Sequence, residues 1–129
     1  MTTQEVATMV ASIGIPYAYY QFPEGTEQAT PFACFFYAYN NDLKADDSNY
    51  QKIEHLILEV YTDNKDFETE ATVEAALASY GMVWSRSEEW IDSERMLEVI
   101  YEMDVVITEA DPVETTPTNT EEDTNGEQD

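Results

Sequence analysis

The spacing of apolar residues predicts a helix near the start of the chain, over residues 3–13. The apolar positions recur every three or four residues, at Val6, Met9, Val10 and Ile13. Thr2 and Glu5 fit a capping box, in which a hydroxyl and a carboxylate satisfy free N–H groups of the first turn. Gly14 is suited to end this helix in the left-handed conformation.

Five further runs are typical of β-strands. Residues 15–22 and 32–39 are rich in aromatic side chains, and they are close enough in sequence to pair as a hairpin with a long loop. Residues 50–62 place apolar side chains on both faces, which favours a central position in the sheet. Residues 82–90 form a fourth strand, and residues 95–107 form a last strand with regular alternation. Its core-facing positions are Leu97, Val99, Tyr101, Met103, Val105 and Ile107.

A second helix is predicted between the third and fourth strands. Residues 63–66 supply its start and Gly81 its stop, so that it ends near Tyr80. Its expected inward-facing residues are Phe67, Val73, Ala76, Leu77 and Tyr80. The order α-β-β-β-α-β-β predicts an α+β fold, with a mainly antiparallel five-stranded sheet and two packed helices.

The composition changes sharply near the end of the chain. Residues 109–129 contain Ala110 and Val113 as their only aliphatic residues, and they contain no aromatic or basic residue. Such a segment cannot bury enough apolar surface to offset the entropy of ordering it. The sequence therefore predicts one domain over residues 1–108, followed by a disordered acidic tail over residues 109–129.

The chain is strongly acidic throughout, with a net charge of −23. Residues 1–108 alone carry 20 acidic and 5 basic residues, a net charge of −15. This balance disfavours sequence-specific nucleic acid binding and anionic membranes, because both need Lys and Arg. It leaves two interpretations, a basic protein partner or a solvated surface. The first ten residues lack the basic and apolar segments of a signal peptide, and no run is long enough to span a membrane.

Few residues are candidates for catalysis or metal binding. Cys34 is the single cysteine and His55 the single histidine. Both fall inside predicted strands and not in a loop or at a helix start, so a structural role is favoured over a catalytic pair. Asp42, Asp46 and Asp47 cluster in a polar loop over residues 40–49, but their spacing does not fit a calcium loop. We therefore expect no enzyme activity, no metal and no cofactor.

The aromatic strands permit two interpretations. A domain of this size cannot bury all of these rings in one core, and Tyr and Trp are favoured at protein interfaces. Interface candidates are therefore drawn from the aromatic strands, the loop 40–49 and the charged face of the last strand: Tyr17, Tyr19, Phe35, Tyr37, Tyr39, Asp42, Asp46, Asp47, Trp90, Glu98 and Glu102.

Four segments, in order and with similar spacing, resemble small tail-completion proteins of siphophages and prophages, of the tail terminator group. They are Gln21–Gly25, Ala45–Asp47 with Tyr50, Val60–Lys65 and Trp90–Glu94. The resemblance covers residues 3–107. Trp90 stands where the family usually has Tyr, and the acidic tail lies outside the pattern.

The resemblance implies a structural virion protein without a cofactor. Tail terminators form a homohexameric ring that caps the finished tail tube, ends its polymerisation and joins the tail to the head connector. The implied partners are thus copies of the chain, the tail tube protein and the head connector or adaptor. The implied location is the head–tail junction of the virion tail, after assembly in the host cytoplasm. An acidic ring lumen would ease the passage of DNA by repelling it.

A different function also fits the charge. An acidic protein can mimic DNA and inhibit a basic nucleic-acid-binding protein, and such a mimic would bind its partner in a salt-sensitive way. A ring-sized assembly on tail tubes favours the tail protein, whereas a monomer that binds basic proteins and ignores tubes favours the mimic.

The tail boundary gives the first testable prediction. A chain that ends at residue 108 should fold and assemble like the full chain, because the removed residues lack the apolar side chains of a core. Thermal unfolding and native mass measurement of the two chains check this. Loss of folding or of assembly in the shorter chain would mean that the domain extends beyond residue 108.

Overall fold

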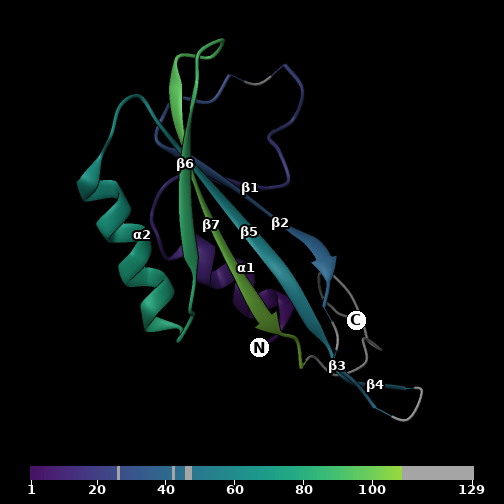
Figure 1. Cartoon of the computed structure of the whole chain (residues 1–129). Helices are drawn as coiled ribbons and strands as arrows, with labels where there is room; N and C mark the ends of the chain where they lie inside the picture. The colour runs from purple at the N-terminus through teal and green to yellow at the C-terminus, as the bar shows by residue number, and fades with distance from the viewer. Residues whose placement is uncertain (26, 42, 46–47, 109–129) are drawn as a thin grey trace, which may run out of the picture.

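Two helices and a five-stranded sheet form the body of the protein (Figure 1). The computed structural model describes residues 1–25, 27–41, 43–45 and 48–108. The elements are α1 (Thr3–Ala11), β1 (Tyr17–Tyr19), β2 (Phe32–Asn40), β3 (Leu43–Ala45), β4 (Ser48–Gln51), β5 (Ile53–Thr62), α2 (Phe67–Ser79), β6 (Ser85–Ile91) and β7 (Met96–Val106). The predicted α+β class and the order of the helices and main strands are confirmed. The predicted tail, residues 109–129, lies outside the described residues.

The main sheet has the strand order β1-β2-β5-β7-β6. The long strand β5 lies at its centre, as its two apolar faces predicted. Part of the predicted loop 40–49 instead forms a separate hairpin of β3 and β4, so the run 50–62 is divided between β4 and β5. Only its second part belongs to the main sheet.

The first strand pair differs from the prediction. β1 runs parallel to β2, with Tyr17 opposite Ala33 and Tyr19 opposite Phe35, so the expected hairpin is wrong and the sheet is mixed. The backbone leaves β1 at Tyr20, where φ is +71°, and residues 20–31 carry the chain back before β2 starts. A loop of this length allows either direction, and aromatic composition carries no information about direction. The other neighbours in the main sheet are antiparallel.

The helix ends follow local rules. In α1 the capping box is confirmed, because the Glu5 N–H donates to Thr2 Oγ1 (3.0 Å) and the Thr2 N–H donates to Glu5 Oε1 (2.8 Å). In α2 the N-cap is Asp66, whose carboxylate accepts from the Thr69 N–H at 3.0 Å. Phe67, expected to face inward, is 75% exposed at the first position of α2, and the Lys65 ammonium lies 5.1 Å from its ring centre. Phe67 is therefore not part of the core cluster, and its predicted inward orientation is wrong.

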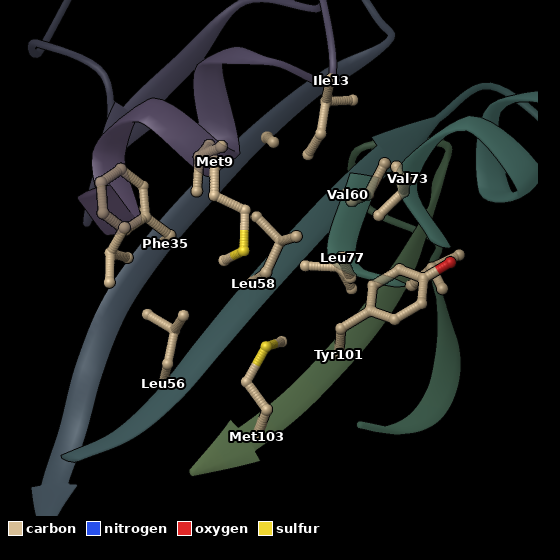
Figure 2. Packing of buried hydrophobic residues seen from close by; sticks show 14 of the residues in the cluster. Met9, Ile13, Phe35, Leu56, Leu58, Val60, Val73, Leu77, Tyr101 and Met103 are labelled. Atoms are coloured by element: carbon tan, nitrogen blue, oxygen red, sulfur yellow. The ribbon is translucent and has the colours of Figure 1, made fainter. Parts of the chain in front are cut away.

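Both helices cover the same face of the sheet (Figure 2). Met9 of α1 and Leu77 of α2 pack with Leu58 of β5 and Tyr101 of β7 in one core cluster. The alternation of the last strand is confirmed at its buried positions, Leu97, Val99, Tyr101, Met103 and Val105. The buried side chains of the sheet therefore face the helices, and the side chains that alternate with them point to the other face.

Ion pairs fasten α2 to the outer strand β6. Glu70 of α2 is 3% exposed, and its carboxylate contacts the Lys65 ammonium at 2.9 Å and the Arg86 guanidinium at 3.2 Å. Arg86 also contacts Glu74 (2.8 Å), which accepts from the Tyr101 hydroxyl (3.0 Å). A buried carboxylate is tolerated where cations and hydrogen bonds satisfy it, so two of the basic residues are used inside the domain.

The core predicts a contrast between two valines. Val99 is fully buried, whereas Val83 is 87% exposed. Val99→Ala should lower the free energy of unfolding by about 2 kcal/mol, because it removes two buried methyl groups and leaves a cavity. Val83→Ala should change it by less than about 0.5 kcal/mol. Urea denaturation of both variants checks this, and equal effects would show that β7 is not part of the core.

Candidate functional site

The second face of the main sheet is not covered by α1 or α2, and we refer to it as the open face. Its side chains alternate with the core set along each strand. They are Phe32, Cys34 and Phe36 of β2, His55, Ile57, Glu59 and Tyr61 of β5, Glu98, Ile100, Glu102 and Asp104 of β7, and Ser85, Ser87 and Glu89 of β6. Antiparallel sheets commonly leave one face to solvent. This face instead carries two adjoining groups of side chains: an aromatic zone of Phe32, Phe36 and Tyr61, and an acidic zone of Glu59, Glu98, Glu102 and Asp104.

The loop after β1 covers the aromatic zone. The ring of Tyr20 lies 5.3 Å from that of Phe36, and the ring of Phe22 meets Phe32 edge-on at 5.5 Å. Phe32 in turn stacks on Tyr61 with centroids 4.8 Å apart. Beneath this cover Cys34 is 6% exposed, and burial raises the pKa of its thiol to about 11. The thiol therefore stays protonated at neutral pH.

A groove lies between this loop and the β6–β7 turn, and it encloses about 1050 Å³. Phe32, Cys34, Tyr61 and Met96 line it from the sheet. Glu27, from the loop, and Glu94, from the turn, are among its acidic lining residues. None of its lining residues is Lys or Arg. The groove is therefore partly aromatic and entirely without positive charge.

Two carboxyl groups meet beside the groove. The Tyr61 hydroxyl lies 3.1 Å from Glu59 Oε1 and 3.1 Å from Glu98 Oε2, so it bridges β5 and β7. Burial raises the pKa of Glu59 to about 7, helped by its hydrogen bond to Glu98 and by the charge of Glu98. Near neutral pH the two carboxyl groups thus share a proton.

His55 bridges two carboxylates at the other end of the open face. Its Nε2 lies 2.9 Å from Glu102 Oε1, and its Nδ1 lies 2.9 Å from Asp104 Oδ1. These hydrogen bonds raise the pKa of His55, because both ring nitrogens can donate only in the imidazolium form. Tyr39 stacks on the imidazole with centroids 4.5 Å apart. The imidazole thus lies between two carboxylates and an aromatic ring.

The structure does not bring Cys34 and His55 together. Cys34 lies opposite Glu59 of β5, and Glu59 is four positions from His55 in the chain, roughly 13 Å along a strand. In the described part of the chain, no group of three or more His, Cys, Asp or Glu side chains is arranged to hold a metal ion. No described helix is long and apolar enough to cross a membrane.

The predicted interface residues are dispersed over the domain. Glu98 and Glu102 lie on the open face, while Tyr17 and Tyr19 lie at the opposite edge of the sheet, 42% and 53% exposed. Trp90 is 44% exposed on the outer strand β6. Tyr39, 57% exposed, covers His55. These positions do not form one continuous patch.

Two predicted positions lie in or against the core. Phe35 is only 5% exposed and belongs to the core, so it offers no surface to a partner. Tyr37 is half-buried against the same cluster. Asp42, Asp46 and Asp47 lie outside the described residues.

The groove and the Glu59–Glu98 pair were not foreseen from the sequence. Their residues come from strands far apart in the chain, and only the β5–β7 register places Tyr61 opposite Glu98. The one available signal was Glu59, which interrupts the apolar run from Leu56 to Tyr61 in β5.

The comparisons with known proteins show a shared fold. No family model matches the sequence, and no curated protein matches it. The structure is similar to a chain of the solved structure "Virion of native gene transfer agent (GTA) particle", with a TM-score of 0.51 and 14% sequence identity. The match covers 81% of this chain and 88% of that chain. At this identity the likeness is one of fold.

The carboxyl pair predicts a pH-dependent stability. The pKa of Glu59 is higher in the folded chain (about 7) than its usual value (4.5), so the folded state holds the proton more tightly. This contribution is present at low pH and is lost as the pH rises from about 4.5 through about 7. Glu59→Gln should therefore raise the free energy of unfolding above this range by about 1–2 kcal/mol, a value discounted for partial solvent exposure.

Urea denaturation across this pH range measures the effect. The matched control is Glu68→Gln, which changes an exposed glutamate of α2 and removes the same charge. The difference between Glu59→Gln and the native chain should grow with pH, and that of the control should stay small. A pH-independent difference for Glu59→Gln would contradict a shared proton.

Proposed function

We propose that this chain is a structural virion protein of the tail terminator group, which caps the phage tail tube as a ring and joins it to the head connector. The observation that carries the proposal is the fold shared with a chain of a gene transfer agent virion, over most of both chains. A match over 88% of that chain means that nearly all of its fold has a counterpart here. The order of segments that resembles tail-completion proteins supports the same function.

The positions of those segments support the proposal further. Three of them are far apart in sequence but line the same groove: Gln21–Gly25 contributes Phe22, Val60–Lys65 contributes Tyr61, and Trp90–Glu94 contributes Ile91. Segments that line one groove can occur together because they form one site. A chance resemblance would not be expected to select segments that meet in space. The fourth segment, Ala45–Asp47 with Tyr50, includes residues outside the described part.

A ring needs contacts between copies, and the exposed aromatic side chains are the candidates. Tyr19 and Trp90 lie on the two outer strands of the main sheet, β1 and β6. A contact from one edge of a copy to the other edge of its neighbour is head-to-tail, the kind of contact that closes rings. Large aromatic side chains are favoured in such interfaces.

The second candidate function, a DNA mimic, is favoured by one observation, the carboxylates of the open face. It predicts a salt-sensitive complex with a basic nucleic-acid-binding protein and no affinity for tail tubes. The two functions are therefore separable by one assay.

The test uses the full chain and tail tubes from the phage or prophage that encodes it. We expect native mass measurement to show a ring-sized oligomer, alone or on tubes, and electron microscopy to show the chain at tube ends. Tube protein that polymerises in its presence should stop at a defined length. A chain that stays monomeric, ignores tubes and binds basic proteins would refute the tail function and favour the mimic.

Two variants make the test specific. Trp90→Ser should weaken ring formation, because it removes an exposed aromatic side chain from an outer strand. Phe67→Ser is the matched control, since Phe67 is 75% exposed but belongs to α2 and not to an outer strand of the sheet. Equal behaviour of the two variants would exclude the β6 edge as a contact between copies.

A further inference from the structure

The groove at one end of the open face has the shape of a docking site. It encloses about 1050 Å³ between the loop after β1 and the β6–β7 turn, which lie at the same end of the sheet in Figure 1. The helices α1 and α2 pack on the other face of the sheet, so neither of them covers the open face between the groove and His55. The groove therefore opens directly onto the acidic zone of β5 and β7.

The wall of the groove on the sheet side is a row of aromatic rings. Phe22 meets Phe32 at 5.5 Å, and Phe32 stacks on Tyr61 at 4.8 Å with an angle of 20° between the planes. Such a row binds aliphatic chains by burial, and it attracts cations through the negative faces of the rings. Its last member, Tyr61, leads to the carboxyl groups of Glu59 and Glu98, each 3.1 Å from its hydroxyl.

All charged residues that line the groove are acidic; Arg95, which follows Glu94 in the β6–β7 turn, is exposed and is not among them. Glu27, Asp63 and Glu94 line the groove, and none of its lining residues is Lys or Arg. Lys65 and Arg86 are engaged in ion pairs with α2, on the other side of the sheet. A bound cation would therefore find carboxylates at the rim and again behind Tyr61.

This charge decides between the possible occupants. The tail of the chain, residues 109–129, has 8 acidic residues and no basic one, so like charges oppose its binding. A second copy docked by the same face would bring the same carboxylates together, and nucleic acid would bring phosphates. A protein segment with basic and apolar side chains is the occupant that satisfies both the rings and the charge.

We propose that the groove and the adjoining open face dock a segment of another protein, in which Arg or Lys alternates with apolar residues. The aliphatic stem of the basic side chain lies along Phe32 and Tyr61, and its charged head reaches Glu59 and Glu98. Apolar neighbours of that residue contact the rings, and further basic residues meet Glu27 and Glu94 at the rim. The inference deepens the proposed function, and rests on it only in placing this partner among the neighbouring virion proteins.

The test titrates the full chain, isotopically labelled, with a synthetic peptide of alternating Leu and Arg. Shifts of NMR signals should concentrate at Phe32, Tyr61 and Glu98 rather than on α2. A peptide in which Ser replaces Leu, with the same charge, should bind about tenfold more weakly, because it cannot cover the rings. Equal binding of the two peptides, or shifts centred on α2, would overturn the proposal.

At a pH well above 7, where both carboxyl groups of the pair are ionised, two double variants with the same change in net charge locate the binding. Glu59→Gln with Glu98→Gln should weaken binding of the Leu–Arg peptide about tenfold or more, since it removes the charges behind Tyr61. Both changes preserve side-chain size and remove a repulsion, so the fold is retained, which a thermal melt checks. Glu24→Gln with Glu68→Gln changes exposed residues that do not line the groove and should weaken binding less than about threefold.

Equal weakening by both double variants would mean diffuse attraction to an acidic protein, and the proposal would fail. It would also fail if Glu59→Gln with Glu98→Gln changed self-association but not peptide binding, because the face would then join copies of the chain. The outcome is separate from that of the tube assay. If the chain caps tubes but does not bind the peptide, the proposed function stands and this inference fails. If the chain binds the peptide but does not cap tubes, this inference stands and the proposed function fails.

Discussion

The antiparallel ladder between β5 and β7 is the constraint on which the rest of the structure depends. It pairs every residue from Ile53 opposite Val106 to Thr62 opposite Leu97. Because side chains alternate between faces, this one register decides both faces of the sheet at once. Leu58 and Tyr101 meet in the core, while Tyr61 and Glu98 meet on the open face. A slip by one residue would expose the core set and bury the carboxylates.

The helices complete only one of the two faces. The capping interactions of Thr2 and Asp66 start α1 and α2, and the ion pairs of Glu70 fix α2 against β6. The apolar side chains of both helices pack against the same side of the sheet. The open face is covered instead by a loop and by contacts between its own side chains. The loop after β1 covers the aromatic zone, and His55 bridges two carboxylates at the far end.

The pair of Glu59 and Glu98 is the one place where this arrangement works against stability. Burial and proximity raise the pKa of Glu59 because two charged carboxylates at that distance repel each other. A domain selected for stability alone would gain by replacing one of them. Such a cost is common where a surface is used for binding, and the groove beside the pair gives this one a use. The basic partner that we propose for the groove would bind these carboxylates, and under the proposed virion function that partner is a neighbouring virion protein.

The sequence by itself determined the local elements, and the reason is that their signals lie within a few residues. Helix periodicity and the capping box gave α1, and strict alternation gave β7 with its buried positions Leu97 to Val105. The glycines 14 and 81 follow the two helices with positive φ, as their positions predicted. The strand order of the main sheet, the direction of β1, the burial of Phe35 and the meeting of Glu59 with Glu98 were decided only by the tertiary structure. These depend on which strands pair and in what register, and packing between segments far apart in the chain sets both.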